Sequence, residues 1–105
     1  MPMPTTRLFV SMLLAIFVTA LGVATASAQV TVRQSHNNRG FQALRDAKFA
    51  EAEQAFRTAI REAESAQARD STHAQSLHGL GTTLLRMGKY SDAELPFKQS
   101  LELYE

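Results

Sequence analysis

The chain repeats itself after 41 residues, and this internal repeat limits the folds that are open to it. Glycine, aromatic and Ala-Glu positions recur together, at a spacing that chance does not explain. A period of this length is typical of solenoids and other repeat arrays. The matched pairs are Gly40 and Gly81, Leu44 and Leu85, Arg45 and Arg86, Lys48 and Lys89, Phe49 and Tyr90, Ala52 and Ala93, Glu53 and Glu94, Phe56 and Phe97, and Ile60 and Leu101.

Each unit has the composition and periodicity of helices. No proline occurs between Thr31 and Pro96, and Ala, Glu, Gln, Leu and Arg, which favour helices, are common. Residues 49–66 carry apolar side chains every three or four positions, which predicts one buried stripe along a helix. The stripe consists of Phe49, Ala52, Phe56, Ala59, Ile60 and Ala63.

Three further helices are expected. A helix over residues 73–87 would start with a capping box from Thr72 to Gln75, and Gly88 would end it in the left-handed conformation. The next helix would start with a capping box over residues 91–94, flanked by a hydrophobic staple of Tyr90 and Leu95. Its expected stripe is Ala93, Phe97, Leu101 and Tyr104. A helix over residues 33–46 is less regular, because His36 and Arg39 interrupt its apolar face.

The second unit resembles a tetratricopeptide repeat. The residues that carry this resemblance are Leu77, Leu80, Gly81, Leu84, Gly88, Tyr90, Ala93, Phe97 and Ser100. The period of 41 residues is longer than the ordinary one of about 34 residues. This longer period resembles that of the kinesin-light-chain-like type of repeat. The resemblance implies an all-α fold, in which antiparallel helix pairs stack as a short α-solenoid with units at about 33–65 and 72–105.

Glycines and aromatic rings explain how such units pack. Gly40 and Gly81 let the partner helix of each pair come close, while Phe56 and Phe97 fill the space between successive pairs. In the first unit Ala47 stands where the pattern has the turn glycine. A left-handed alanine costs about 1 kcal/mol, so this first turn is the weaker one.

Residues 1–28 are predicted to be a signal peptide. Arg7 precedes an apolar run of 16 residues, 8–23, and Ala26-Ser27-Ala28 is a small-x-small cleavage site. Cleavage after Ala28 would leave a repeat domain of residues 29–105, exported to the periplasm of a bacterial cell. The alternative is an uncleaved membrane anchor, for which the run is short of the roughly 20 residues that a span requires.

Composition argues against several functions. One of the 11 basic residues lies in the leader, so 10 remain against 10 acidic ones, without a basic block that would favour nucleic acid. There is no cysteine, and His73 and His78 are five positions apart, which does not suit a metal pair on one helical face. Gly79 to Thr83 lacks the lysine and the strand of a phosphate loop, so helix packing explains its glycines better. We therefore expect no enzymatic activity, no cofactor, no metal, and membrane contact only through a retained leader.

The resemblance also implies where a partner would bind. In tetratricopeptide repeats the first helix of each pair lines the concave groove. The corresponding residues here are Asn37, Asn38, Phe41 and Arg45 from unit one, and Gln75, His78, Thr82 and Arg86 from unit two. Amides can bond a peptide backbone and arginines can pair with carboxylates. The same residues could also be exposed polar positions without a ligand.

The sequence thus favours a protein-interaction scaffold of the cell envelope. It would bind a peptide segment of a partner protein or assemble with itself as a homo-oligomer. The alternative function is that of an N-terminal repeat piece of a larger envelope enzyme or enzyme accessory.

Overall fold

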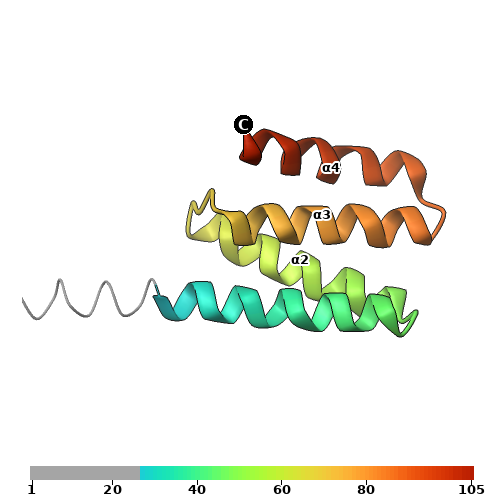
Figure 1. The fold of residues 1–105 in the computed structure, drawn as a ribbon, viewed down its shortest axis with the longest axis horizontal. Helices are drawn as coiled ribbons and strands as arrows, with labels where there is room; N and C mark the ends of the chain where they lie inside the picture. The colour runs from blue at the N-terminus through green and yellow to red at the C-terminus, as the bar shows by residue number, and fades with distance from the viewer. Residues whose placement is uncertain (1–26) are drawn as a thin grey trace, which may run out of the picture.

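The computed structural model describes residues 27–105, which form helices joined by short turns (Figure 1). A first helix covers residues 27–45, and three more follow: α2 over Phe49–Ser65, α3 over Ser71–Arg86 and α4 over Tyr90–Tyr104. This part of the chain contains no strand, which confirms the all-α prediction. Apart from its last two residues, the predicted signal peptide lies outside the described residues. Within residues 27–105, no helix combines the length and apolar character needed to cross a membrane.

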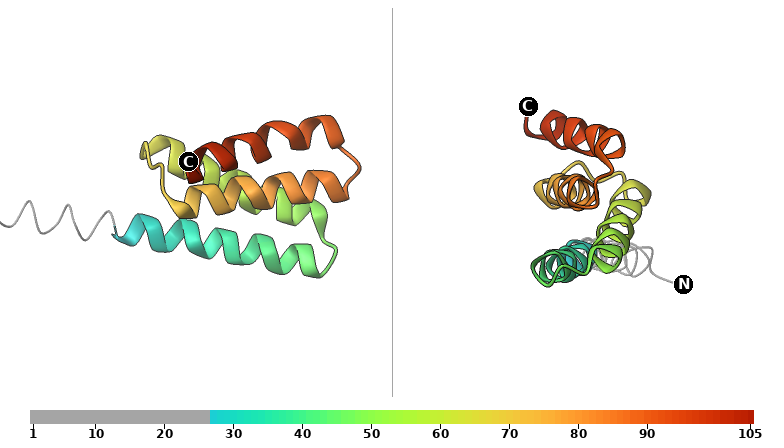
Figure 2. Two further views of the ribbon diagram at one scale, coloured as in Figure 1. Left: turned by 45° about the horizontal axis from the view of Figure 1, so that its top comes forward. Right: turned by 90° about the vertical axis from the view of Figure 1, so that its right-hand side faces the viewer.

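The helices form two antiparallel pairs that stack on each other. The helix over residues 27–45 and α3 lie side by side, and α2 packs behind both of them (Figures 1 and 2). α4 returns along α3 and forms the edge of the molecule farthest from the first helix (Figure 1). This arrangement places the first helix of each pair next to its counterpart, as expected for a solenoid.

The turns inside the two pairs have the same structure. Ala47 and Gly88, which are 41 residues apart, both adopt positive φ, at 56° and 78°. The backbone N–H of the following residue, Lys48 or Lys89, donates to the carbonyl oxygen five residues earlier at 2.8 Å. This is the hydrogen bond of the Schellman motif. The repeat read from the sequence is therefore confirmed, including the left-handed alanine in place of glycine.

The predicted start of α3 is wrong by two residues. The helix begins at Ser71, and the carboxylate of Asp70 accepts a hydrogen bond from the backbone N–H of His73 at 2.9 Å. Thr72, expected to be the cap, is buried in the first turn, where its carbonyl oxygen accepts from the amide of Asn37. Asp70 is the better cap here because the same carboxylate also pairs with a buried arginine.

The predicted capping box and staple of α4 are also wrong. The helix begins at Tyr90, directly after the turn, and its N-cap residue Lys89 makes no capping bond with its side chain. Tyr90 and Leu95 are both exposed and do not enclose the helix start. The reason is the Schellman turn at Gly88, which leads straight into the helix and leaves no room for a separate cap.

Phe56 lies at the centre of the core and is fully buried. Its ring fills the space left by two glycines, Gly40 of the first helix and Gly79 of α3. A Cβ atom built on Gly40 would lie 2.7 Å from the ring, and one on Gly79 would lie 2.3 Å from it. The predicted stripe of α2 is confirmed, and both glycines serve packing.

The buried face of α4 differs from the predicted one. Ala93 is buried as expected and Phe97 is half-buried, but Leu101 and Tyr104 are exposed. Pro96 and Ser100 are buried in their place, and the hydroxyl of Ser100 donates to the carbonyl oxygen of Ala74 at 2.9 Å. The same positions are buried in α2, where Ala52, Ala55 and Ala59 are their equivalents. The small residues of α4 therefore meet α3, and no described element covers its outer apolar residues.

We expect Gly79→Ala to lower the free energy of unfolding by about 1–3 kcal/mol, because the new methyl group would collide with a ring that has nowhere to move. Gly81→Ala is the matched control. Both variants replace glycine by alanine within α3 and so gain the same helix propensity, about 1 kcal/mol. The new Cβ atom at position 81, however, lies 3.0 Å from the ring of Phe97, which is half-exposed and can move aside. Urea denaturation of both variants tests this, and equal stabilities would contradict the role assigned to Phe56.

Gly81→Leu should lower the melting temperature strongly, because a whole side chain cannot be accommodated between α3 and the ring of Phe97. An unchanged melting temperature would contradict the close packing of the second pair.

Candidate interaction surface

An ion pair ties the first helix to the start of α3. The guanidinium of Arg33 donates two hydrogen bonds to the carboxylate of Asp70, at 2.9 and 2.7 Å. The side chain of Arg33 is only 3% exposed, whereas that of Asp70 is 38% exposed. This two-bonded geometry fixes the orientation of both partners. The pair therefore sets how the first helices of the two units lie against each other.

Asn37 continues this polar seam one turn further along the first helix. Its amide nitrogen donates to the carbonyl oxygen of Thr72 at 3.1 Å, and its amide oxygen accepts from the hydroxyl of Ser76 at 2.6 Å. All three residues are buried. Since buried polar groups are costly unless they are paired, this network admits one register between the first helix and α3.

The arginine also controls the acidity of its partner. Hydrogen bonds from Arg33 are the main reason why the pKa of the Asp70 carboxyl falls to about 2, and the backbone N–H of His73 adds to the effect. Partial burial acts in the opposite direction but is weaker. The same hydrogen bonds raise the pKa of Arg33, so the pair stays charged across the physiological range.

The predicted groove residues lie on the first helix and α3, the two helices that this seam holds side by side. Four of them are exposed, namely Asn38, Arg45, His78 and Arg86, and three are half-buried, namely Phe41, Gln75 and Thr82. Phe41 packs the edge of its ring on Phe56, with 4.9 Å between the ring centres. The guanidinium of Arg86 lies over the ring of Phe49 at 5.7 Å. Both side chains are thus anchored on the core while keeping surface exposed.

Asn37 does not fit the predicted role. It is fully buried, and the bonds to Thr72 and Ser76 use its amide, so it belongs to the seam and cannot contact a ligand. His78 lies edge-on to Phe97 at 5.6 Å, so it contacts α4 as well as facing solvent. Asn38 is exposed, but it is equivalent to Gly79, which faces the preceding unit, so Asn38 points away from α3. We define the interaction surface as the five other predicted residues: Phe41, Arg45, Gln75, Thr82 and Arg86.

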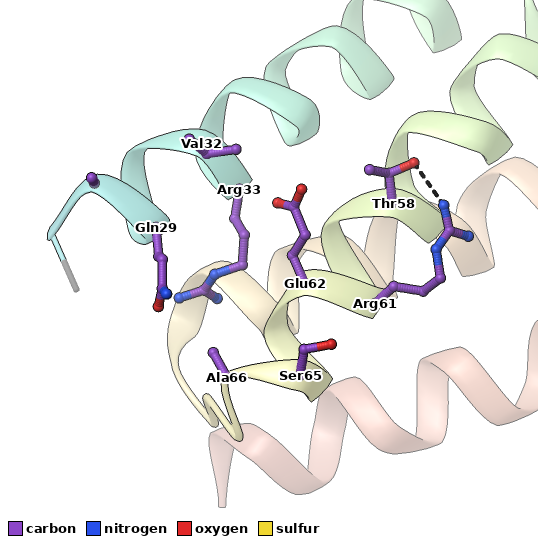
Figure 3. A pocket seen from close by; sticks show the side chains of 9 residues that line it. Gln29, Val32, Arg33, Thr58, Arg61, Glu62, Ser65 and Ala66 are labelled. Atoms are coloured by element: carbon purple, nitrogen blue, oxygen red, sulfur yellow. Dashed lines mark hydrogen bonds between the residues drawn. The ribbon is translucent and has the colours of Figure 1, made fainter. Parts of the chain in front are cut away.

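Two hollows are lined by residues that lie outside this interaction surface. One, of about 710 Å³, opens between the first helix and the end of α2, and its lining includes Arg33 and Glu62 (Figure 3). Arg61 closes its side through a hydrogen bond to the hydroxyl of Thr58 at 3.1 Å (Figure 3). Its rim includes Ala28, the residue before the predicted cleavage point, so export would alter it.

The second hollow, of about 740 Å³, lies between α2 and α4. Its apolar lining comes mainly from Ile60 of α2 and three leucines of α3, with Leu95 and Pro96 on the α4 side. Among the described residues, no group of three His, Asp or Glu side chains is placed to hold a metal ion. The polar atoms of the interaction surface are an amide, a hydroxyl and guanidinium groups, which suit hydrogen bonding to a peptide.

Comparison with known families decides the identity of the fold. A profile described as tetratricopeptide repeat matches residues 31–105, which covers both helix pairs. The chain belongs to the tetratricopeptide repeat family. The longer, kinesin-light-chain-like type of repeat fits this match and the 41-residue period. Neither curated proteins nor solved structures give a match to the chain.

The tetratricopeptide repeat is a non-catalytic fold, and its members generally mediate contacts between proteins. Sequence reasoning predicted an interaction surface on the first helices of the two pairs but missed the polar seam. The signal was present, since Arg33, Asn37, Gly40 and Leu44 are spaced four, three and four residues apart, as inward positions of a helix are. Two of these are polar, which hid the stripe.

Asp70→Asn should lower the free energy of unfolding at pH 7 by about 1–2 kcal/mol. This is below the cost of breaking a fully buried pair, because Asp70 is partly in water. Asparagine still caps the helix, so the change removes mainly the charge that balances Arg33. The carboxyl has a lowered pKa in the folded protein, so its contribution is complete above about pH 4 and is lost as the pH falls towards 2.

The measurement is the unfolding free energy of wild type and variant from pH 7 to pH 2. The difference between them should close between pH 4 and pH 2. Glu102→Gln is the control, because Glu102 is exposed and has no ion pair among the described residues. A difference that stays constant over this range would contradict the role of the ion pair.

Proposed function

We propose that this tetratricopeptide repeat protein acts in the bacterial cell envelope as a scaffold that holds a peptide segment of another protein. The observation that carries the proposal is the interaction surface on two rigidly joined first helices. Such a surface is formed before the ligand arrives, which reduces the entropy cost of binding.

The chemistry of the surface favours an extended, acidic peptide. Arg45 and Arg86 occupy equivalent positions in the two units and are both exposed, and each can pair with a carboxylate. Gln75 offers an amide group that suits a peptide backbone. The exposed part of Phe41, one helical turn before Arg45, offers an apolar contact. A partner segment with carboxylates that reach the two arginines and an apolar side chain about one turn away would match this arrangement.

The envelope location follows from the predicted leader. The apolar run and the small-x-small site of residues 26–28 are those of a cleaved export signal. The absence of cysteine is compatible with an oxidising compartment, because a repeat domain of this kind is held by packing and by the Arg33–Asp70 pair.

Peptide binding is tested with a displayed library of random peptides selected on the purified protein. Selected peptides should be enriched in Asp and Glu, and they should bind at least about ten-fold more weakly to the double variant Arg45→Glu, Arg86→Glu, since each arginine contributes a charge-assisted hydrogen bond. Arg57→Glu, at an exposed position of α2, is the control and should bind like wild type. Selected peptides that do not discriminate between wild type and the double variant would refute the proposed surface.

Export is tested by producing the full chain with a C-terminal tag in a Gram-negative host and separating the periplasm from the cytoplasm. We expect the tagged protein in the periplasm, with the mass of a chain whose first residue is Gln29. Ala28→Leu, which removes the small residue at the predicted site, should retain the leader. A full-length mass for the wild-type protein in every fraction would contradict cleavage.

A further inference from the structure

α4 carries an apolar stripe that nothing in the described structure covers. Tyr90, Leu101 and Tyr104 are 69%, 65% and 63% exposed, and Phe97 between them is half-buried. They lie along the helix that forms one edge of the molecule (Figure 1). Contiguous exposed apolar side chains of this kind mark an interaction site more often than a simple surface.

The repeat shows what this stripe is equivalent to. Shifting back by 41 residues brings it onto Phe49, Phe56, Ile60 and Ala63 of α2. Of these, Phe56 and Ala63 are fully buried and Ile60 is 8% exposed, because α2 packs against the next unit. The stripe on α4 therefore continues an interface that already exists within the molecule.

A second copy cannot cover the stripe by stacking head to tail. Its first helix would have to take the place of α3, and Asn38 would then stand in the position of Gly79. At Gly79 even a single Cβ atom would lie 2.3 Å from the ring of Phe56. An asparagine against Phe97 does not fit this geometry. Tyr104 also replaces the fully buried Ala63, and its ring would collide with a helix placed as α3 is placed on α2.

The stripe instead has the spacing of a seam between two helices that pack along their length. Its positions are 90, 94, 97, 101 and 104, which alternate between steps of four and three residues. This spacing is that of a coiled-coil seam, in which side chains of one helix fill holes on the other. Glu94 is its one polar member. An identical stripe on a second copy is self-complementary, as two-fold symmetric dimers require.

We propose that two copies of the chain associate through α4, with the two helices antiparallel and centred on Phe97. Charge favours this orientation over the parallel one. Glu94 lies three residues before Phe97 and Lys98 one residue after it, so an antiparallel pair places them about 3 Å apart along the axis, on the same flank. A parallel pair would instead bring the two Glu94 carboxylates together.

The oligomeric state of the purified protein tests this, measured by sedimentation equilibrium over a range of concentrations after its N-terminus is established by mass spectrometry. Wild type should approach the mass of a dimer, and Leu101→Glu should remain monomeric. Leu95→Glu is the matched control: Leu95 is 60% exposed on the same helix but faces the hollow beside α2. It should leave the dimer intact. A wild-type monomer at every concentration, or a dimer that Leu101→Glu does not weaken, would overturn the proposal.

Charge exchange tests the orientation. Glu94→Lys and Lys98→Glu should each raise the dimer dissociation constant about ten-fold, since each brings like charges together, and the double variant should restore it. Circular dichroism confirms that each variant keeps its helices. A double variant no better than the single ones would overturn the antiparallel arrangement.

The dimer does not depend on the proposed peptide surface, which lies on the first helix and α3. Leu101→Glu should therefore retain binding of the selected peptides, and the Arg45, Arg86 double variant should remain dimeric.

Discussion

The packing of Phe56 against two glycines sets the distance between the helix pairs, and the rest of the structure depends on it. The ring is fully buried between Gly40 and Gly79, on two helices that are 39 residues apart in sequence at these points. With a side chain at either glycine, the first helix and α3 would be pushed away from α2. They would then no longer lie close enough for Arg33 to reach Asp70, or for Asn37 to reach Ser76. The interaction surface on these two helices is thus a consequence of a missing Cβ atom at two positions.

The polar seam adds direction to this packing. Apolar contacts around Phe56 fix a distance but tolerate small sliding movements, whereas the two hydrogen bonds of Arg33 and the amide of Asn37 have defined acceptors. The second unit has Ala74 and His78 at the equivalent positions. Ala74 contributes only its carbonyl oxygen, which accepts from Ser100 of α4. The seam is therefore particular to the junction between the two units and is not part of the repeat itself.

The repeat, the helix pairs and the stripe of α2 could be predicted from the sequence because each is a matter of local spacing. Even the left-handed Ala47 followed from its register with Gly88. What could not be predicted depended on partners distant in the sequence. Asp70 was overlooked as a cap because its advantage comes from Arg33, 37 residues away. The face of α4 was predicted only in part, because the pattern expects cover for Leu101 and Tyr104 that no described element provides, whereas Ser100 bonds Ala74 of α3. For the candidate surface, the family resemblance indicated the first helices, but it could not show that Asn37 is used internally.

The 41-residue repeat shows that the outer faces of the first helix and of α4 differ in character. The face of the first helix that corresponds to the buried Thr72, Gly79 and Thr83 of α3 carries Thr31, Asn38 and Gln42, all of them exposed and polar. Such a face is satisfied by water and resembles the polar outer surface of a terminal repeat. The opposite face, on α4, has kept the aromatic and aliphatic residues of an internal junction. Among the described residues, the outer face of α4 therefore has more apolar surface left to bury than the polar outer face of the first helix, and this asymmetry favours a closed pair of copies over open-ended stacking.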